Sequence, residues 1–319
     1  MSISPGNKKS FLKRLLNFKM VFKFIAESLH IIRQGNTFRD KLILAEYFLK
    51  IPFFLFKSLV TAKEFMVIQE KYKKLIGRVT MKNKYGKFLC ERNIMSVYII
   101  NDNYQKKFDG CLYLKEGVFM DVGAHIGKYS VCIGKMLGEK GKVIALEPET
   151  FNFELLKQNV KLNKLDNILC LQKAVYSHKT KIPFYTTKDF GEGYHSLVKM
   201  PETILQSEIQ VDTLDNIVCD FKIQRVDLIK IDTECVEAKI LQGTLEILKT
   251  YRPQIIAEAW DEEYLFEIVQ VLNPFGYQYK KIDDTNYFFY NPSSKAVRAA
   301  SVVAAMVISI ASFELTVFV

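Results

Sequence analysis

Apolar runs of strand length alternate with helix-length segments from Val118 to about residue 273. Strands that are apolar along their whole length and separated by helices are typical of a parallel sheet covered on both faces. The predicted strands span 118–122, 142–147, 168–175, 227–232 and 254–260. The predicted helices between them span 127–137, 150–163, 235–249 and 261–273.

Two more predicted strands follow, 277–282 and 286–291, joined by a turn at Asp283-Asp284-Thr285. They should form an antiparallel hairpin that closes one edge of the sheet. Residues 181–186 predict a smaller hairpin after the third strand. The sequence therefore predicts an α/β fold with a Rossmann-like, doubly wound, mostly parallel sheet of seven strands.

The stretch FMDVGAHIGKYS (119–130) is a first strand, a turn and the start of a helix. Ligands of doubly wound sheets bind at the carboxyl ends of the strands, where the strand order switches. Gly123 allows a tight turn and leaves room for a ligand, and Gly127 lets the helix approach the strand. The first N–H groups of that helix favour a carboxylate or a phosphate. Glu147 ends the next strand, 20 residues after Gly127, and could accept both hydroxyls of a ribose.

The type of cofactor follows from charge. The dinucleotide fingerprint G-x-G-x-x-G fails here, because Asp121 and Ile126 stand at its first and third glycine positions. A carboxylate at Asp121 would repel a pyrophosphate but attract an ammonium or a sulfonium group. S-adenosylmethionine carries both cations and a carboxylate. The alternative for Asp121 is a structural acid that caps the helix.

These residues resemble the FkbM family of Rossmann-like S-adenosylmethionine-dependent methyltransferases. The matching stretches follow one another in the expected order: FMDVGAHIGKYS, KVIALEPETFNFELLKQNVKLN, QKAV (172–175), GYHSL (193–197), DLIKIDTECVEAKILQG (227–243) and RPQIIAEAW (252–260).

The resemblance implies roles for individual residues. Asp121, Gly123 and Gly127 would shape the methionine end of the cofactor site, Glu147 would hold the ribose, and the turn around Ala174 would lie near the adenine. The neighbouring residues of the same turns are included in the predicted cofactor site: Ala124, His125 and Pro148. The family usually has Asn, Ser and Gly where this chain has His125, His195 and Cys235.

The predicted reaction is transfer of a methyl group to a hydroxyl oxygen of a small acceptor such as a sugar or a glycolipid, an acceptor class that the resemblance implies. Asp232, at the end of the fourth strand, is the first candidate for a base or a positioning group. Glu234 and His195, the latter in a Gly-rich loop, are further candidates. Each could instead have a structural role. Asp232 and Glu234 could also bind a divalent metal, but no further ligand set is evident, and we predict no metal.

Excess positive charge is confined to the first quarter of the chain. Residues 1–78 contain 16 Lys/Arg and five Asp/Glu, whereas the whole chain has a formal net charge of +10. Residues 11–25 have a helical period with lysines off the apolar stripe, and helices are expected at 39–50 and 53–69 with a break at Pro52. Such a segment can lie on an anionic membrane surface, or it can be a helical cap packed on the catalytic domain. Nucleic acid is a less favoured partner, because the aromatic residues follow a helical stripe.

The predicted organisation has three parts. Residues 1–78 form a basic helical extension, and 79–292 form the main domain, in which 79–117 are a small β cap and 118–292 the Rossmann-like core. The third part, 293–319, is an apolar tail whose uncharged stretch, 299–313, is too short to span a bilayer.

The chain is expected in the cytoplasm, and a peripheral position at the inner face of the membrane stays open. No secretory signal is evident, and the six cysteines form no C-x-x-C pair, which disfavours a zinc site and suits a reducing compartment.

Two other functions stay open. A nucleotide-dependent oxidoreductase would share the fold, but the missing fingerprint argues against it. A non-catalytic, membrane-associated binding protein could retain the fold, and Cys235 at a turn where glycine is expected slightly favours that reading.

Overall fold

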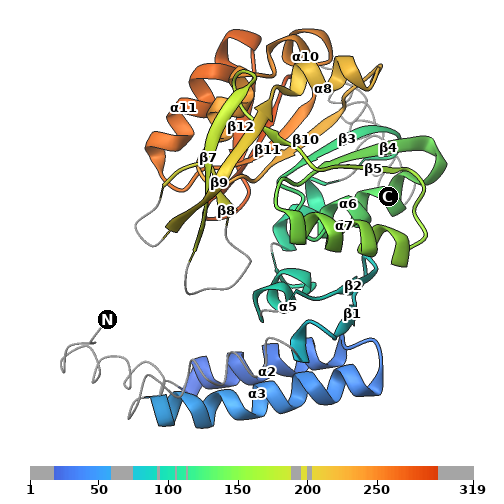
Figure 1. Ribbon diagram of the computed structural model, residues 1–319, viewed down its shortest axis with the longest axis vertical. Helices are drawn as coiled ribbons and strands as arrows, with labels where there is room; N and C mark the ends of the chain where they lie inside the picture. The colour runs from blue at the N-terminus through green and yellow to red at the C-terminus, as the bar shows by residue number, and fades with distance from the viewer. Residues whose placement is uncertain are drawn as a thin grey trace, which may run out of the picture. The chain divides into compact units, whose positions relative to one another are not determined.

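The computed structural model describes residues 18–58, 75–91, 94–104, 106–112, 114–187, 195–199 and 203–293 (Figure 1). These residues form two compact units. The described part of the first comprises residues up to Tyr104 together with Gln158–Lys164, and the second comprises the rest. The predicted apolar tail lies outside the described residues. None of the described helices combines the length and the hydrophobicity needed to cross a bilayer.

The first unit begins with two helices, α2 (Phe18–Arg33) and α3 (Phe38–Ser58). Four residues join them, and Phe24 packs edge-to-face on Phe48 with ring centroids 6.3 Å apart. A reciprocal cap starts α3, because the Thr37 N–H donates to Asp40 Oδ2 (2.9 Å) and the Asp40 N–H donates to Thr37 Oγ1 (3.2 Å). The hairpin of β1 (Thr80–Lys82) and β2 (Lys87–Leu89) and the helix α5 (Ile94–Ile100) follow.

Two local predictions for this unit are wrong. The chain does not break at Pro52, since α3 continues to Ser58; an interior proline removes one backbone hydrogen bond but need not end a helix. Residues 59–69 of the second predicted helix, and residues 11–17 of the first, lie outside the described residues. Residues 79–117 were predicted to be a β cap, but the run MSVYII (95–100) within them lies in α5. Val97 and Ile100 are fully buried while Tyr98 and Ile99 between them are half-buried, which is helical spacing.

The second unit contains the seven-stranded sheet, in the order β12-β13-β11-β10-β3-β4-β5. Five strands pair in parallel: β5 (Ile168–Leu171), β4 (Gly141–Leu146), β3 (Gly117–Val122), β10 (Leu228–Ile231) and β11 (Gln254–Glu258). The edge hairpin of β12 (Gln278–Lys281) and β13 (Asn286–Tyr290) is confirmed, and β13 also pairs antiparallel with β11. Phe119 and Met120 point to opposite faces of β3 and are both fully buried, so both faces of the sheet are covered.

The helices of this unit are α6 (Lys128–Leu137), α7 (Thr150–Leu162, whose residues from Gln158 on belong to the first unit), α8 (Leu214–Asp220), α9 (Glu237–Gln242), α10 (Leu245–Thr250) and α11 (Glu262–Leu272), with 3-10 turns η1 (Lys106–Gly110), η2 (Gly138–Lys140) and η3 (Asn273–Phe275). The single helix predicted at 235–249 is therefore two. Gly243 lies between them, and a Cβ on it would come within 2.3 Å of the Tyr176 carbonyl oxygen, so the close approach of Tyr176 requires glycine there.

The predicted third strand, 168–175, is also divided. β5 ends at Leu171, and β6 (Ala174–Val175) enters a second sheet with the order β6-β9-β7-β8. The hairpin expected at 181–186 is part of this sheet: β7 (Thr180–Thr187) pairs with β9 (Thr203–Asp212) and with β8 (His195–Ser196). β9 has the sequence TILQSEIQVD, in which polar and apolar residues do not alternate regularly, so the sequence analysis did not identify it as a strand.

Candidate active site

The strand order switches between β3 and β10. The chain runs outward from β3 through β4 to β5, and then from β10 through β11 in the other direction. Ligand crevices of doubly wound sheets open at such a point, beyond the carboxyl ends of the strands. Gly123 (φ 75°) follows β3, and a Cβ on it would lie 2.0 Å from the Asp232 carbonyl oxygen. Glycine is therefore required by the close approach of two strand ends.

The turn after β3 leads into α6. Ala124 is buried, His125 has φ 51°, and Gly127 (φ 87°) is the N-cap of α6. A Cβ on Gly127 would lie 2.5 Å from Leu156 Cδ1 in α7. The expectation that Gly127 lets the helix approach its own strand is therefore wrong, because the close neighbour is a side chain of the next helix.

Asp121 is fully buried in β3, beside Lys230 of β10 in the sheet register. Ser130 Oγ donates to its Oδ2 at 2.5 Å, whereas no described residue forms a hydrogen bond with its Oδ1. Burial raises the pKa of Asp121, and the Lys230 ammonium and Ser130 oppose that shift. A buried acceptor left without a donor costs free energy, so Oδ1 suits the ammonium group of a ligand.

Glu147 follows β4, the neighbour of β3, and is also buried. Its Oε2 accepts from the His125 N–H (2.8 Å) and its Oε1 from the Glu149 N–H (3.0 Å). Burial raises the pKa of Glu147 to about 7, although His125 and the two N–H donors oppose the shift. The carboxylates predicted at neighbouring strand ends thus lie at one edge of the sheet, and the turn carrying His125 connects them.

Pro148 and Ala174 lie at the same edge. Gln172, between β5 and β6, donates from Nε2 to Thr150 Oγ1 (3.0 Å) and to the Pro148 carbonyl oxygen (3.5 Å). Ala174 then starts β6 and is buried. The segment that carries Ala174 is in this way tied to the segment that follows Glu147.

A second polar cluster lies at the ends of β10 and β11. Lys230 Nζ donates to Asp232 Oδ2 at 2.8 Å and lies over the Tyr129 ring, 5.0 Å from its centroid. Burial by itself would lower the pKa of Lys230, but the Asp232 and Asp121 carboxylates outweigh that effect and raise it. Glu258 ends β11 and accepts from Thr285 Oγ1 at 3.1 Å. Burial, followed by the Asp232 carboxylate, raises the pKa of Glu258.

Three carboxylates of this cluster could hold a cation. Ligand oxygens of Asp232, Glu234 and Glu258 lie within 4.8 Å of one another. Oxygen ligands of this kind suit a hard divalent metal. However, Lys230 already pairs with Asp232, so an internal ammonium provides part of the charge compensation that a metal would supply.

The turn after β10 has an unusual backbone. Glu234 (φ 59°) and Cys235 (φ 78°) are consecutive residues in the left-handed region. Cys235 thus has the left-handed backbone conformation that glycine adopts without strain. Ser196 Oγ donates to the Glu234 carbonyl oxygen at 2.9 Å, which ties β8 to this turn.

His195 was expected in a loop and instead begins β8, where it pairs with Thr186. Its ring is half-buried and stacks on Phe184 with centroids 5.6 Å apart. The Ser196 hydrogen bond brings the segment of His195 to the Glu234 turn.

Residues 121–279 match the methyltransferase FkbM domain. This chain therefore carries an FkbM-family methyltransferase domain. The match begins at Asp121 and includes both carboxylate clusters.

Other known proteins are similar to parts of the chain. A probable cobalt-precorrin-6B C(15)-methyltransferase (decarboxylating) of Sulfurisphaera tokodaii is 41% identical over 54 residues, which is 17% of this chain and 28% of that protein. A solved methyltransferase FkbM from Methylobacillus flagellatus KT is 14% identical, with a TM-score of 0.41 over 85% of this chain and 60% of that one. A precorrin-6y C5,15-methyltransferase from Geobacter metallireducens GS-15 is 14% identical, with a TM-score of 0.38 over 59% and 87%. At these TM-scores the fold assignment depends on the strand order of this chain itself.

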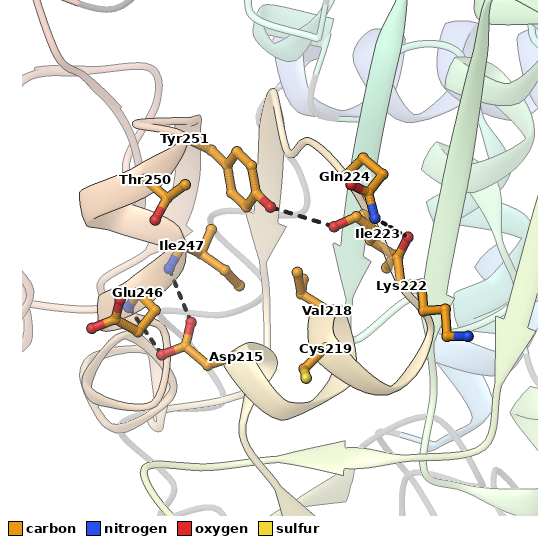
Figure 2. A pocket seen from close by; sticks show the side chains of 10 residues that line it. All are labelled: Asp215, Val218, Cys219, Lys222, Ile223, Gln224, Glu246, Ile247, Thr250 and Tyr251. Atoms are coloured by element: carbon orange, nitrogen blue, oxygen red, sulfur yellow. Dashed lines mark hydrogen bonds between the residues drawn. The ribbon is translucent and has the colours of Figure 1, made fainter.

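Two cavities lie near the described FkbM domain core. One, of about 120 Å³, adjoins the turn after β10 and is lined by Cys235, Glu237, Tyr176 and Tyr264 among others. A larger one, of about 420 Å³, lies between α8 and α10 (Figure 2). There the Tyr251 hydroxyl points toward the Ile223 carbonyl oxygen, and Asp215 accepts the N–H groups of Glu246 and Ile247. These residues precede β10 and β11, so this cavity is at the amino ends of the strands and is not part of the carboxyl-edge site.

Sequence reasoning missed Lys230, Glu258 and Ser130. Glu258 ends an apolar strand, as Glu147 does, and the same signal could have identified it. Lys230 interrupts the apolar run LIKI, an arrangement that indicates a buried charge with a partner. Ser130 is a small polar residue in a helix, and only the tertiary structure shows that it reaches Asp121.

Proposed function

We propose that this chain transfers a methyl group from S-adenosylmethionine to a hydroxyl oxygen of a small acceptor, such as a sugar or a glycolipid. The observation that carries the proposal is the pair of buried carboxylates, Asp121 and Glu147, at the adjoining carboxyl ends of β3 and β4. The FkbM domain match supports the reaction class. When bound, the cofactor supplies a methyl group on a sulfonium centre.

The residues fit this cofactor in charge and in hydrogen-bonding capacity. Asp121 Oδ1 lacks a donor among the described residues and would take the ammonium group. Glu147 accepts one backbone N–H at each oxygen, and a carboxylate has about four acceptor sites, so two remain for ribose hydroxyls. A pyrophosphate would place its negative charge beside both carboxylates, which disfavours a dinucleotide.

The polar cluster at the ends of β10 and β11 contains the candidates for the general base that takes the hydroxyl proton of the acceptor. Asp232 is held by the Lys230 ammonium, which orients its carboxylate. Glu258, with its pKa raised by burial, is better suited to take the acceptor proton, and Asp232 then has a positioning role. Glu234 and His195 border the same turn and are the further candidates for contact with the acceptor.

Calorimetric titration with S-adenosylhomocysteine and with NAD tests the cofactor assignment. We expect binding of the first only. Asp121→Asn should weaken it about 10- to 100-fold, because a buried ion pair becomes a neutral contact. Tighter binding of NAD, or unchanged affinity in the folded variant, would favour the oxidoreductase or a structural role for Asp121.

Incubation with radiolabelled S-adenosylmethionine and glycan or lipid extracts tests the reaction. Label should enter an acceptor, and Glu258→Gln should lower kcat more than Asp232→Asn if Glu258 is the base. Cofactor binding without transfer to any extract would support the non-catalytic alternative. The opposite order of the two variants would assign the base to Asp232.

A further inference from the structure

A large aromatic side chain stands exposed at the carboxyl edge of the seven-stranded sheet. Trp260 lies two residues beyond Glu258, the last residue of β11. It is the single tryptophan of the chain, and its surface is 44% exposed. Tryptophan side chains are on average highly buried, because the indole ring carries a large apolar surface. An exposed indole at the edge where ligands of doubly wound sheets bind is therefore a candidate for ligand contact.

The backbone on both sides of Trp260 is fixed. The N–H of Ala259, which is buried, donates to the Thr285 carbonyl oxygen at 2.7 Å. Asp261 is the N-cap of α11, and its Oδ1 accepts two backbone N–H groups of the first helical turn at 2.9 and 3.0 Å. The ring is thus presented from a defined turn between a strand and a helix, so ordering it for a ligand costs little conformational entropy.

The Trp260 side chain also contacts the polar cluster at the ends of β10 and β11. It forms a hydrogen bond with Glu258, which opposes the burial that raises the pKa of that carboxyl. The indole N–H is a donor only, so Glu258 is the acceptor. Ligand oxygens of Glu258, Asp232 and Glu234 lie within 4.8 Å of one another. The N–H edge of the ring therefore faces the carboxylates to which the proposed function assigns the acceptor hydroxyl.

An exposed indole beside carboxylates matches both kinds of surface that a sugar ring has. A pyranose carries hydroxyl groups around its rim, which donate hydrogen bonds to carboxylates, and C–H groups on its faces, which pack on an aromatic ring. An acyclic polyol has the hydroxyl groups without the rigid apolar face. The cluster holds three carboxylates and the one ammonium of Lys230, and this charge disfavours uronic acids and sugar phosphates.

We infer that Trp260 is a binding residue for the acceptor, and that a neutral pyranose ring stacks on its indole while a sugar hydroxyl reaches the polar cluster. This inference rests on the proposed function, because it names the residue that recognises the acceptor of that reaction. The ring is the chemistry that a free saccharide and a lipid-linked saccharide share.

Tryptophan fluorescence of the full chain tests the inference, because Trp260 is the single tryptophan. The probes are the methyl glycosides of glucose, galactose, mannose and rhamnose at millimolar concentration, added with S-adenosylhomocysteine present. At least one should shift the emission in a saturable way, whereas sorbitol and methyl glucuronoside should leave it unchanged. Octyl glucoside below its micelle concentration separates the two sources of the sugar. Tighter binding than methyl glucoside indicates a lipid-linked acceptor, and equal binding indicates a free saccharide.

Variants at Trp260 separate ring contact from a structural role, with glycoside binding followed by saturation-transfer NMR. Trp260→Leu should weaken binding about tenfold, because the planar ring is lost. Trp260→Phe keeps a ring and should retain the affinity within about threefold. Phe221→Leu is the matched control, because Phe221 is an aromatic residue of similar exposure (38%) that follows α8, before the amino end of β10. It should bind as the wild type does.

The outcomes distinguish this inference from the proposed function. Emission that no glycoside changes, while S-adenosylhomocysteine binds and methyl transfer occurs, would overturn the inference and leave the methyltransferase standing. Equal glycoside binding by wild type and by folded Trp260→Leu would overturn it as well, as would an equal response to sorbitol. Should Trp260→Leu not fold, the wild-type fluorescence and Trp260→Phe decide. Absence of S-adenosylhomocysteine binding would overturn both proposals.

Discussion

At the scale of single residues, several groups are kept in states that they would not adopt in water. Glu237 at the start of α9 is buried and accepts both the N–H (2.9 Å) and the hydroxyl (3.2 Å) of Thr233. Burial nevertheless raises its pKa from 4.5 to about 7. Between these two values the folded chain binds a proton that the unfolded chain has lost.

The pH dependence of stability follows from that difference. The Glu237 contribution to the free energy of unfolding is largest below pH 4.5 and falls by about 3 kcal/mol as the pH rises to 7. Glu237→Gln removes the titrating group while keeping an acceptor oxygen. Urea unfolding from pH 5 to 8 should show a shallower decline for the variant than for the wild type. Parallel curves would mean that Glu237 is ionised in the folded state.

The backbone of Cys235 is strained, because it has a left-handed conformation. Left-handed conformations cost an L-residue about 1–2 kcal/mol, and glycine avoids that cost. Cys235→Gly should therefore raise the free energy of unfolding by about 1 kcal/mol after the added entropy of the unfolded chain. Cys235→Ala removes the same thiol and keeps the strain, so it should give no gain. Equal effects of the two changes in denaturant unfolding would exclude backbone strain as the cause.

At the scale of elements, the close approach of β3 and β10 depends on Gly123. Gly276, after η3, has the same φ of 75°, but a Cβ there would meet only Asn291 Nδ2 at 3.7 Å. Comparing an alanine substitution at Gly276 with one at Gly123 therefore separates the stability cost of backbone strain from the cost of steric overlap.

We expect Gly276→Ala to cost about 1 kcal/mol of stability, from the left-handed backbone alone. Gly123→Ala should cost several kcal/mol more, because the new methyl group would overlap the Asp232 carbonyl oxygen at the switch point. It should also weaken S-adenosylhomocysteine binding. Chemical denaturation and calorimetry measure both effects, and similar losses at the two positions would contradict the steric account.

At the scale of the whole molecule, the predicted cofactor residues all belong to the second unit, while α2 and α3 belong to the first. A ligand present at 100 times its Kd stabilises the state that binds it by about 2.7 kcal/mol. Hydrogen exchange with S-adenosylhomocysteine should therefore slow in peptides at the carboxyl ends of β3, β4 and β10.

The same experiment reports on coupling between the units. Peptides from α2 and α3 should exchange at unchanged rates when the cofactor analogue is added. Protection of α2 and α3 as large as that of β3 would show that both units open together, and the two units would then not be energetically separate.

The order of apolar strands and helices in the sequence already determined the sheet, because its parallel strands are apolar on both faces and each helix must cover one face. It also placed Asp121 and Glu147 at one edge, since parallel strands end together. Only the tertiary structure decided that Lys230 pairs with Asp232, that Glu258 joins them, and that residues 95–100 form a helix. Lys230 and Asp232 are only two residues apart, but both belong to a strand end that is enclosed between β3 and β11, and that neighbourhood is set by contacts between residues far apart in the chain. Local sequence patterns contain no record of such distances.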